Sequence, residues 1–351
     1  MKKILIIFLG LVALASCSNG DEPMMPDPFN GGYGSYDLYI ATTGFPGHPE
    51  MICSIHGDTI YECAEGAHVL SLLAEDSDWY ALLKTDDGVY SSVKNGVLLR
   101  VYNVKTIWGF TVDGGAIYTV QENRDGTVWV CKDDQRLYDV PNYVQYDQFS
   151  VHDGNVSMGI NDGRSGYWHN GSYIDIFGLQ GGCDWVYGID KQEDNLLITY
   201  QSNQESGEYF YYWNGKNYEL PEKFIPRTSQ LVNGHAFIIG GEITSIGASA
   251  IRKSTAVIID GIETVLNEQP DLAAVQLVAS GAFTFILVRD IGGRSNKSCI
   301  YQNLKLMEVP KSITVPEDVR KYYAQYMNED GKMSLADLGI TAIARVKTVS
   351  Y

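Results

Sequence analysis

The chain has 351 residues, with 43 acidic against 26 basic side chains and a formal charge of −17. This balance argues against binding to nucleic acid or to anionic lipid through a basic surface, so neither is expected as a partner. Setting aside a leader and a tether leaves about 315 residues, which suffices for one large all-β domain or for two ordinary ones.

The amino terminus predicts an export signal over residues 1–16. Lys2 and Lys3 precede an apolar run from Ile4 to Ala15, which is too short to span a bilayer as a helix. The run ends in Leu-Ala-Ser-Cys at Cys17. This motif resembles the lipobox of bacterial lipoproteins, in which cleavage before the cysteine leaves that residue to carry the lipid. An ordinary secretory signal with an incidental cysteine is the alternative.

The resemblance implies that Cys17 is the lipid attachment site and that the lipid is the only membrane contact. Loss of Lys2 and Lys3 with the leader lowers the formal charge from −17 to −19. Residues 17–35 then form the lipidated cysteine and a proline- and glycine-rich tether. The stretch Ser-Asn-Gly-Asp-Glu after Cys17 is similar to the acidic export tract of Bacteroidetes surface lipoproteins. This similarity implies an outer-membrane protein exposed on the cell surface, with the periplasmic face as the alternative.

A hairpin motif recurs seven times along residues 36–351. Its copies are anchored, at spacings of 36 to 46 residues, on Gly57, Gly96, Gln135, Gly171, Gly215, Gly261 and Asn303. Asn-Gly and Asp-Gly pairs supply the positive φ angles that two-residue hairpin turns require. A period of about 40 to 50 residues with four strands per repeat is typical of the blades of a β-propeller. The sequence therefore predicts an all-β fold, a single propeller of seven four-stranded blades, with six or eight blades left open.

The two ends of this domain predict how the ring closes. The first repeat has three strands, and residues 340–350 form a surplus strand that would complete it. Between the last hairpin and that strand, apolar residues at helical spacing predict one short helix over about 316–329. The "YW-x-NG" hairpins, as in Trp213-Asn214-Gly215, resemble those of Bacteroidetes lipoproteins whose shared property is the fold rather than an activity.

Metal and cofactor motifs are weak. Residues 326–337 resemble a calcium loop of the EF-hand kind, but Tyr326 stands where the first carboxylate belongs. A helix-capping turn is the favoured interpretation, and a weak Ca²⁺ site is left open. Cys53, Cys131 and Cys299 occupy equivalent places on different blades, so they are expected to be buried rather than paired. No cofactor, no structural metal and no catalytic residue is assigned.

The aromatic stretch "EYFYYWNGKNYEL" at residues 208–220 resembles a ligand platform at first sight. Strand alternation makes both of its faces aromatic, which is typical of a strand packed between neighbouring blades. We therefore interpret it as the third and fourth strands of blade 5.

One face of the propeller is expected to carry any binding site. The connections on that face are long and polar, whereas those on the other face are tight turns. Its candidate ligand-binding residues include five arginines that could engage an acidic group. The candidates are Phe45, His48, Arg124, Asp125, Asp162, Arg164, Glu205, Arg252, Arg289 and Arg294.

Three classes of function remain open. The favoured one is a binding module for a glycan or for an outer-membrane protein, in a monomeric domain. A propeller polysaccharide lyase or glycosidase would require acids or a metal converging near the ring axis. A structural or assembly lipoprotein would dock through the side of a blade or through the predicted helix. The fold alone does not discriminate between them.

Overall fold

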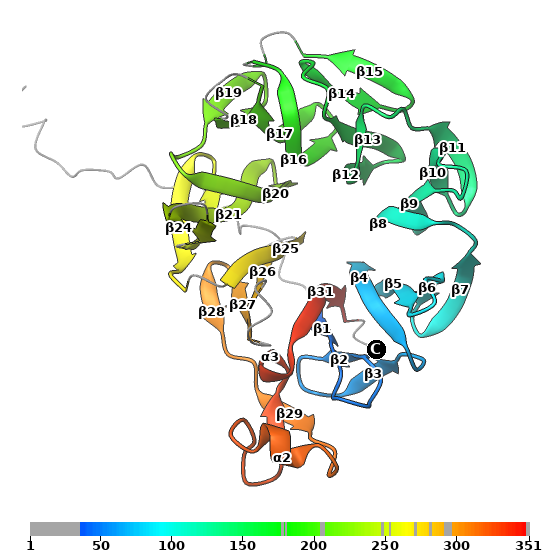
Figure 1. Ribbon diagram of the computed structural model, residues 1–351, viewed down its shortest axis with the longest axis vertical. Helices are drawn as coiled ribbons and strands as arrows, with labels where there is room; N and C mark the ends of the chain where they lie inside the picture. The colour runs from blue at the N-terminus through cyan, green and yellow to red at the C-terminus, as the bar shows by residue number, and fades with distance from the viewer. Residues whose placement is uncertain are drawn as a thin grey trace, which may run out of the picture.

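The computed structural model describes residues 36–176, 179, 181–203, 208–246, 249–252, 254–269, 272–280, 283–290 and 297–348. The leader, Cys17 and the tether lie outside these residues. Seven antiparallel sheets stand around a common axis, each with one strand at the centre of the ring and one at its perimeter (Figure 1). The predicted seven-bladed β-propeller is confirmed.

Each blade runs from an innermost strand outward to the perimeter. Blade 1 consists of β31 (Ile340–Lys347), β1 (Tyr36–Thr42), β2 (Met51–Ser54) and β3 (Thr59–Glu62). Blade 2 consists of β4 (Ala67–Glu75), β5 (Asp78–Thr85), β6 (Tyr90–Lys94) and β7 (Val97–Tyr102). Blade 3 consists of β8 (Thr106–Asp113), β9 (Ala116–Glu122), β10 (Val128–Lys132) and β11 (Gln135–Asp139). Blade 4 consists of β12 (Val144–His152), β13 (Asn155–Ile160), β14 (Gly166–His169) and β15 (Ser172–Asp175).

The remaining blades follow the same plan. Blade 5 consists of β16 (Cys183–Gln192), β17 (Asn195–Ser202), β18 (Tyr209–Trp213) and β19 (Lys216–Glu219). Blade 6 consists of β20 (Phe224–Val232), β21 (His235–Ile246), β23 (Thr255–Ile259) and β24 (Ile262–Asn267), and β22 (Ser249–Arg252) pairs with β21. Blade 7 consists of β25 (Leu272–Ser280), β26 (Phe283–Asp290), β27 (Ser298–Gln302) and β28 (Lys305–Met307).

The outer hairpins show why the repeat motif carries Asn or Asp. The Oδ1 atom of Asn95 accepts the backbone N–H of Trp79 at 2.9 Å, so the turn is tied to the second strand of its own blade. The same bond recurs in the hairpins that begin at Asp133, Asn170, Asp260 and Asn303. Each turn thus satisfies a backbone donor as well as reversing the chain.

Two predicted anchors are wrong by one residue. The turn of blade 3 is Asp133–Asp134 and that of blade 7 is Asn303–Leu304, whereas Asp134–Gln135 and Gln302–Asn303 were predicted. The four turn residues have φ between 46° and 67°. Without a glycine to mark the second position, the sequence leaves the register of these two turns open.

The ring closes through the carboxyl-terminal strand, as predicted. β31 pairs antiparallel with β1, with Ile343 opposite Ile40. The side chain of Gln276 in blade 7 makes two hydrogen bonds to β31. Its amide N–H donates to the carbonyl of Ile343, and its oxygen accepts the N–H of Ile343, both at 2.9 Å. Gln145 makes the same two-way contact with Val186 between blades 4 and 5.

The segment between β28 and β31 leaves the ring (Figure 1) and contains β29 (Lys311–Thr314), α2 (Arg320–Tyr323), β30 (Lys332–Ser334) and α3 (Leu335–Leu338). The predicted helix over 316–329 is wrong in extent, and the second short helix was not predicted. β29 pairs with β30, and Val315 N–H donates to the carbonyl of Gly331 at 3.0 Å. Residues 316–329 as one helix would be about 21 Å long, so the two ends of this loop could not meet.

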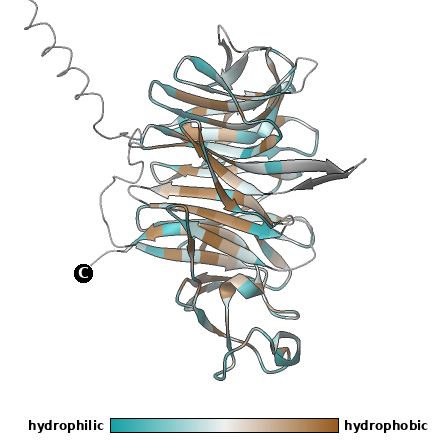
Figure 2. Ribbon diagram, turned by 90° about the vertical axis from the view of Figure 1, so that its left-hand side faces the viewer, coloured by the Kyte–Doolittle hydropathy of each residue, from teal (hydrophilic) through white to brown (hydrophobic). Residues whose placement is uncertain are grey.

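Apolar side chains fill the spaces between neighbouring blades, while the turns at their ends are hydrophilic (Figure 2). Phe210 and Tyr211 point to opposite faces of β18 and are both almost fully buried. The aromatic stretch is therefore the predicted interior hairpin of blade 5. The five cysteines of the described chain are free thiols, four of them buried and Cys299 partly so. Neither helix among the described residues is long and apolar enough to cross a membrane.

Candidate functional site

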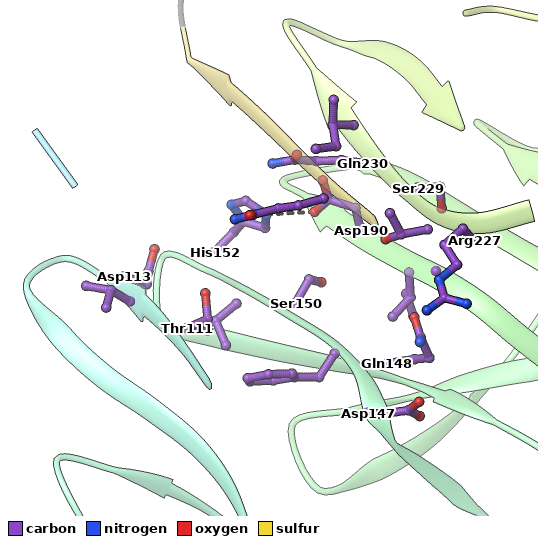
Figure 3. A pocket seen from close by; sticks show the side chains of 18 of the residues that line it. Thr111, Asp113, Asp147, Gln148, Ser150, His152, Asp190, Arg227, Ser229 and Gln230 are labelled. Atoms are coloured by element: carbon purple, nitrogen blue, oxygen red, sulfur yellow. Dashed lines mark hydrogen bonds and ion pairs between the residues drawn. The ribbon is translucent and has the colours of Figure 1, made fainter. Parts of the chain in front are cut away.

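A pocket of about 640 Å³ lies among the inner strands of blades 2 to 7 (Figure 3). It extends from the middle of these strands, at Asp147 and Arg227, to the rim where they turn into the second strands, at Glu75, Asp113 and His152. Its size is in the range of small-molecule sites. The lining is mostly polar, so its chemistry depends on which polar groups already have partners within the protein.

Carboxylates at the rim accept hydrogen bonds from the backbone of the next blade. Glu75, the last residue of β4, accepts the backbone N–H groups of Gly114 and Gly115 at 2.7 and 2.6 Å. Asp113, the last residue of β8, accepts the N–H of Gly154 at 2.7 Å and that of Asp153 at 3.1 Å. Hydrogen bonds to ionised acceptors are the strong kind. These carboxylates therefore act as latches between consecutive blades.

A third latch joins blades 4, 5 and 6 through Asp190. One carboxylate oxygen lies 2.7 Å from His152 Nε2, and the other accepts the N–H of Leu231 at 2.7 Å and the side-chain amide of Gln192 at 3.1 Å. Asp190 is only 3% exposed, so the carboxylate needs these donors. Burial lowers the pKa of His152, but the hydrogen bond and charge of Asp190, with Asp113 and Asp153 adding to it, leave that pKa raised.

A second set of lining residues has no partner of this kind. Asp147, Gln148, Arg227 and Gln230 make no side-chain hydrogen bond or ion pair with any residue that the structure describes. Figure 3 shows Gln148 between Asp147 and Arg227, which come from β12 and β20 on either side of blade 5. Uncommitted charges and amides in one cavity are groups that a ligand can satisfy.

The wall of the pocket also contains two enclosed hydroxyl groups. Ser150 Oγ and Ser229 Oγ have no hydrogen-bond partner in the described structure. Ser229 lies against Gly188 of blade 5, where a β-carbon would come within 2.5 Å of both its N and its Oγ atoms. The glycine is therefore what allows β20 to place a polar side chain here.

No metal centre is formed by the described residues, in which no three His, Cys, Asp or Glu side chains come together to hold an ion. In the loop that resembles a calcium site, Asn328 Oδ1 already accepts the N–H groups of Asp330 and Lys332. Asp337, at the end of that motif, lies in α3, and burial raises the pKa of its carboxyl. Asn328 therefore closes a turn with its own side chain, while the helix-capping role of this turn and the weak Ca²⁺ site both stay predictions.

The predicted candidate residues on the long-loop face form separate small groups. Phe45 is buried and packs against His48 and Tyr323, and His48 pairs with Asp318 at 3.2 Å. Asp125 accepts bonds within its own turn, from the N–H and the hydroxyl of Thr127. Arg124 is exposed.

Arg164 has the most complete environment of these candidates. It pairs with Asp162 at 2.7 Å and lies over the rings of Tyr143 and Tyr173, at 4.1 and 4.4 Å from their centroids. The hydrogen bond and charge of Arg164 lower the pKa of Asp162. Arg289 is half-buried in β26, whereas Glu205, Arg294 and the side chain of Arg252 lie outside the described residues. A ligand role for these residues stays a prediction.

The pocket residues were missed because they lie within strands. Asp147 and Arg227 sit at register irregularities of β12 and β20 that aim them away from ordinary pairing. A β-bulge is defined by the partner strand, so it is not visible in one segment alone. The available signal was a charged residue within an otherwise strand-like segment, as at Arg227 after Pro226.

No protein-family model and no curated protein matches the chain. Similar solved structures include uncomplexed acylaminoacyl peptidase from Pyrococcus horikoshii, at 9% identity and a TM-score of 0.53, where the match covers 91% of this chain and 66% of that one. Apo AztD from Citrobacter koseri matches at 12% identity and a TM-score of 0.45, covering 91% of this chain and 100% of that one. The β-propeller domain of the Trilobed protease from Pyrococcus furiosus matches at 8% identity and 0.43, covering 71% and 97%. At these identities the similarity concerns the fold alone.

Proposed function

We propose that the chain is a lipid-anchored lipoprotein whose propeller is a binding module for a polar ligand, either a glycan or a polar segment of an outer-membrane protein. Cys17 and the tether would hold the ring at the outer membrane, facing the cell surface. The support for this part is the lipobox and the acidic tract in residues 1–22.

The binding function is supported by a difference between the charged residues of the central pocket: some are hydrogen-bonded within the protein, and two are not. Glu75, Asp113 and Asp190 each accept hydrogen bonds from backbone N–H groups, and Asp190 also contacts His152 and Gln192. The side chains of Asp147 and Arg227 in the same cavity make no hydrogen bond or ion pair with a described residue. A fold that commits most of its pocket charges but leaves two uncommitted is suited to recognition of a ligand from outside.

A second candidate is a lyase or glycosidase, and one contact favours it. A histidine oriented by a buried carboxylate, as His152 is by Asp190 at 2.7 Å, is the arrangement of a general base. The other two rim carboxylates already accept two backbone N–H groups each. Of the acids in the pocket or beside His152, those without a side-chain partner among the described residues are Asp147, at mid-strand in the pocket, and the exposed Asp153, next to His152 in the turn. Neither is hydrogen-bonded to His152. A purely structural lipoprotein is the third candidate and would need no uncommitted groups in the pocket.

The test is a glycan array combined with a thermal-shift screen on the soluble chain that begins near Gly34. Binding should disappear in Gln148→Ala and Arg227→Ala and persist in Lys305→Ala, which changes an exposed lysine in the outermost strand of blade 7, outside the pocket. Cleavage of a polysaccharide that depends on His152 would replace the binding function with the enzymatic one. If no member of a broad panel of glycans and membrane proteins bound, the structural role would be favoured.

A further inference from the structure

The inner strands share one irregularity that forms a ring around the axis. In six of the seven, one residue within the strand bulges out of register with the second strand of its blade, and in β12 the irregularity spans Gln145 to Gln148. β16 has a second bulge at Asp184, next to its first residue. We call all of these positions except Asp184 the bulge ring. The single-residue members are Leu70, Trp108, Tyr187, Arg227, Val275 and Thr341.

Charge within the bulge ring is confined to two blades. Asp147 and Arg227 are its charged members, and the other blades place apolar, aromatic or hydroxyl side chains there. Bulges re-aim side chains and are common beside functional sites. In blade 6, Gly240 lies beside the bulge, and a β-carbon there would come within 2.3 Å of the carbonyl oxygen of Ile225, so the backbone of this blade is fitted to the irregularity. In blade 4, Gly159 lies opposite the irregularity, and a β-carbon there would come within 2.8 Å of the side chain of Val186 in blade 5.

The two charges lie in the same pocket without pairing with each other. No ion pair within 4.0 Å joins Asp147 to Arg227 or joins either to another described residue. A guanidinium with no internal partner offers a planar fork for a carboxylate. Asp147 and the amide of Gln148 offer acceptors and a donor for hydroxyl groups close to that fork.

The acidity of the rim does not prevent an anion from binding at Arg227. Glu75 and Asp113 end their strands, whereas Arg227 lies five residues before the end of β20, which corresponds to about 16 Å along a strand. That separation exceeds the screening length of about 8–10 Å at physiological salt. Asp190 is nearer, but its carboxylate already contacts His152 and accepts the N–H of Leu231. Among the described residues, Asp147 is the unpaired acidic group that lines the same pocket, so a ligand whose carboxylate binds Arg227 must place hydroxyl donors, and not its charge, against Asp147.

The size and the remaining lining favour a sugar over a smaller anion. The cavity of about 640 Å³ is also lined by Thr111, Thr228 and Gln230, which are neutral donors and acceptors suited to many hydroxyl groups.

We propose that Asp147, Gln148 and Arg227, the part of the bulge ring that lines the pocket with charged and amide groups, form the recognition subsite for an acidic sugar, a hexuronate residue within an oligosaccharide. Its carboxylate binds the Arg227 guanidinium, and its hydroxyl groups donate to Asp147 and hydrogen-bond with the Gln148 amide. This inference rests on the proposed binding function and assigns its ligand class.

The experiment uses the full mature chain in detergent and calorimetric titration with three tetrasaccharides: galacturonate, mannuronate and hyaluronan oligomers. The matched probe for each is its methyl ester, which keeps the rings and hydroxyls and removes the charge. We expect at least one acid to bind about 10- to 100-fold more tightly than its ester, the range of one charge-assisted contact. Arg227→Ala should reduce the affinity for that acid to the level of its ester, and Arg227→Lys should recover only part of it.

The controls separate this inference from the proposed function. Lys305→Ala, at an exposed position of β28 outside the pocket, should leave both affinities unchanged, and equal urea midpoints should show that each variant is folded. Equal binding of acid and ester, or retention of acid binding in Arg227→Ala, would overturn the hexuronate subsite while leaving the binding module in place. Binding of free glutamate in competition with the sugars would overturn the sugar class. Failure of all six sugars to bind would overturn the inference, and the glycan array would then decide the proposed function independently.

Discussion

Replacing Asp190 by Asn is the sharpest test of how the inner strands are held. The substitution keeps the size of the side chain, so it creates no cavity, and its remaining oxygen can still accept the N–H of Leu231. It removes the charge that His152 contacts at 2.7 Å in a site where Asp190 is 3% exposed. A hydrogen bond to a charged group contributes about 1.5–3 kcal/mol. We expect a loss of about 2–3 kcal/mol in the free energy of unfolding, within that same range.

The pH dependence of this loss has a definite sign. Folding raises the pKa of His152 above its usual value near 6.5 because of Asp190. A group whose pKa is raised by folding stabilises the folded state fully below the unfolded pKa, and this contribution is lost as the pH rises through the folded pKa. The stability difference between wild type and Asp190→Asn should therefore be larger at pH 5.5 than at pH 9.

The assay is urea unfolding of both proteins at several pH values, followed by tryptophan fluorescence and circular dichroism. The pKa of His68 is also raised, through its contacts with Glu50 and Asp86. His68→Gln in both backgrounds removes that contribution from the comparison. A stability difference that does not change with pH, or that grows as the pH rises, would refute the role assigned to the His152–Asp190 pair.

Three further outcomes test the fold and the pocket wall. Gln276→Ala should weaken ring closure by about 1–3 kcal/mol, because Ile343 loses both partners of its backbone; a urea midpoint equal to wild type would contradict this. Gly188→Ala should destabilise by about 1–3 kcal/mol, because its β-carbon would lie 2.5 Å from Ser229 N, and an unchanged free energy of unfolding would refute this close approach of blades 5 and 6. The thiol of Cys183 should resist a disulfide reagent at pH 8 until the chain is unfolded, because burial raises its pKa to about 12; rapid reaction in the native state would show that blade 5 opens.

Local turn chemistry made the fold predictable. Asn170 and Gly171 have φ of 45° and 88°, the pair of positive values that an Asn-Gly hairpin turn adopts. Repeated at blade spacing, this signal indicated the number of blades and their register without any long-range information. Where Asp134 or Leu304 replaces the glycine, the same turn forms but the sequence no longer marks its position.

The pocket was not predictable by the same means. Arg227 faces the axis because Pro226 pairs with Gly240 and Thr228 pairs with Ile239, which leaves the residue between them out of register. This bulge depends on how β20 pairs with β21 at Gly240. The sequence of either strand alone does not indicate it. Loop length instead directed attention to the opposite face, where Arg164 pairs with Asp162 and lies over two tyrosine rings.

The separation between latches and uncommitted residues leads to a last prediction about Arg227. Since this side chain contacts no described acceptor, Arg227→Ala should change the free energy of unfolding by no more than about 0.5 kcal/mol, as expected for a surface substitution. Asp190→Asn should do the reverse, lowering stability while leaving the groups that meet the ligand in place. A binding site whose side chains are held on latched strands loses little conformational entropy when a ligand arrives. If Arg227→Ala destabilised the fold as much as Asp190→Asn, the arginine would be part of the framework, and the pocket would lose the uncommitted cation on which its binding function depends.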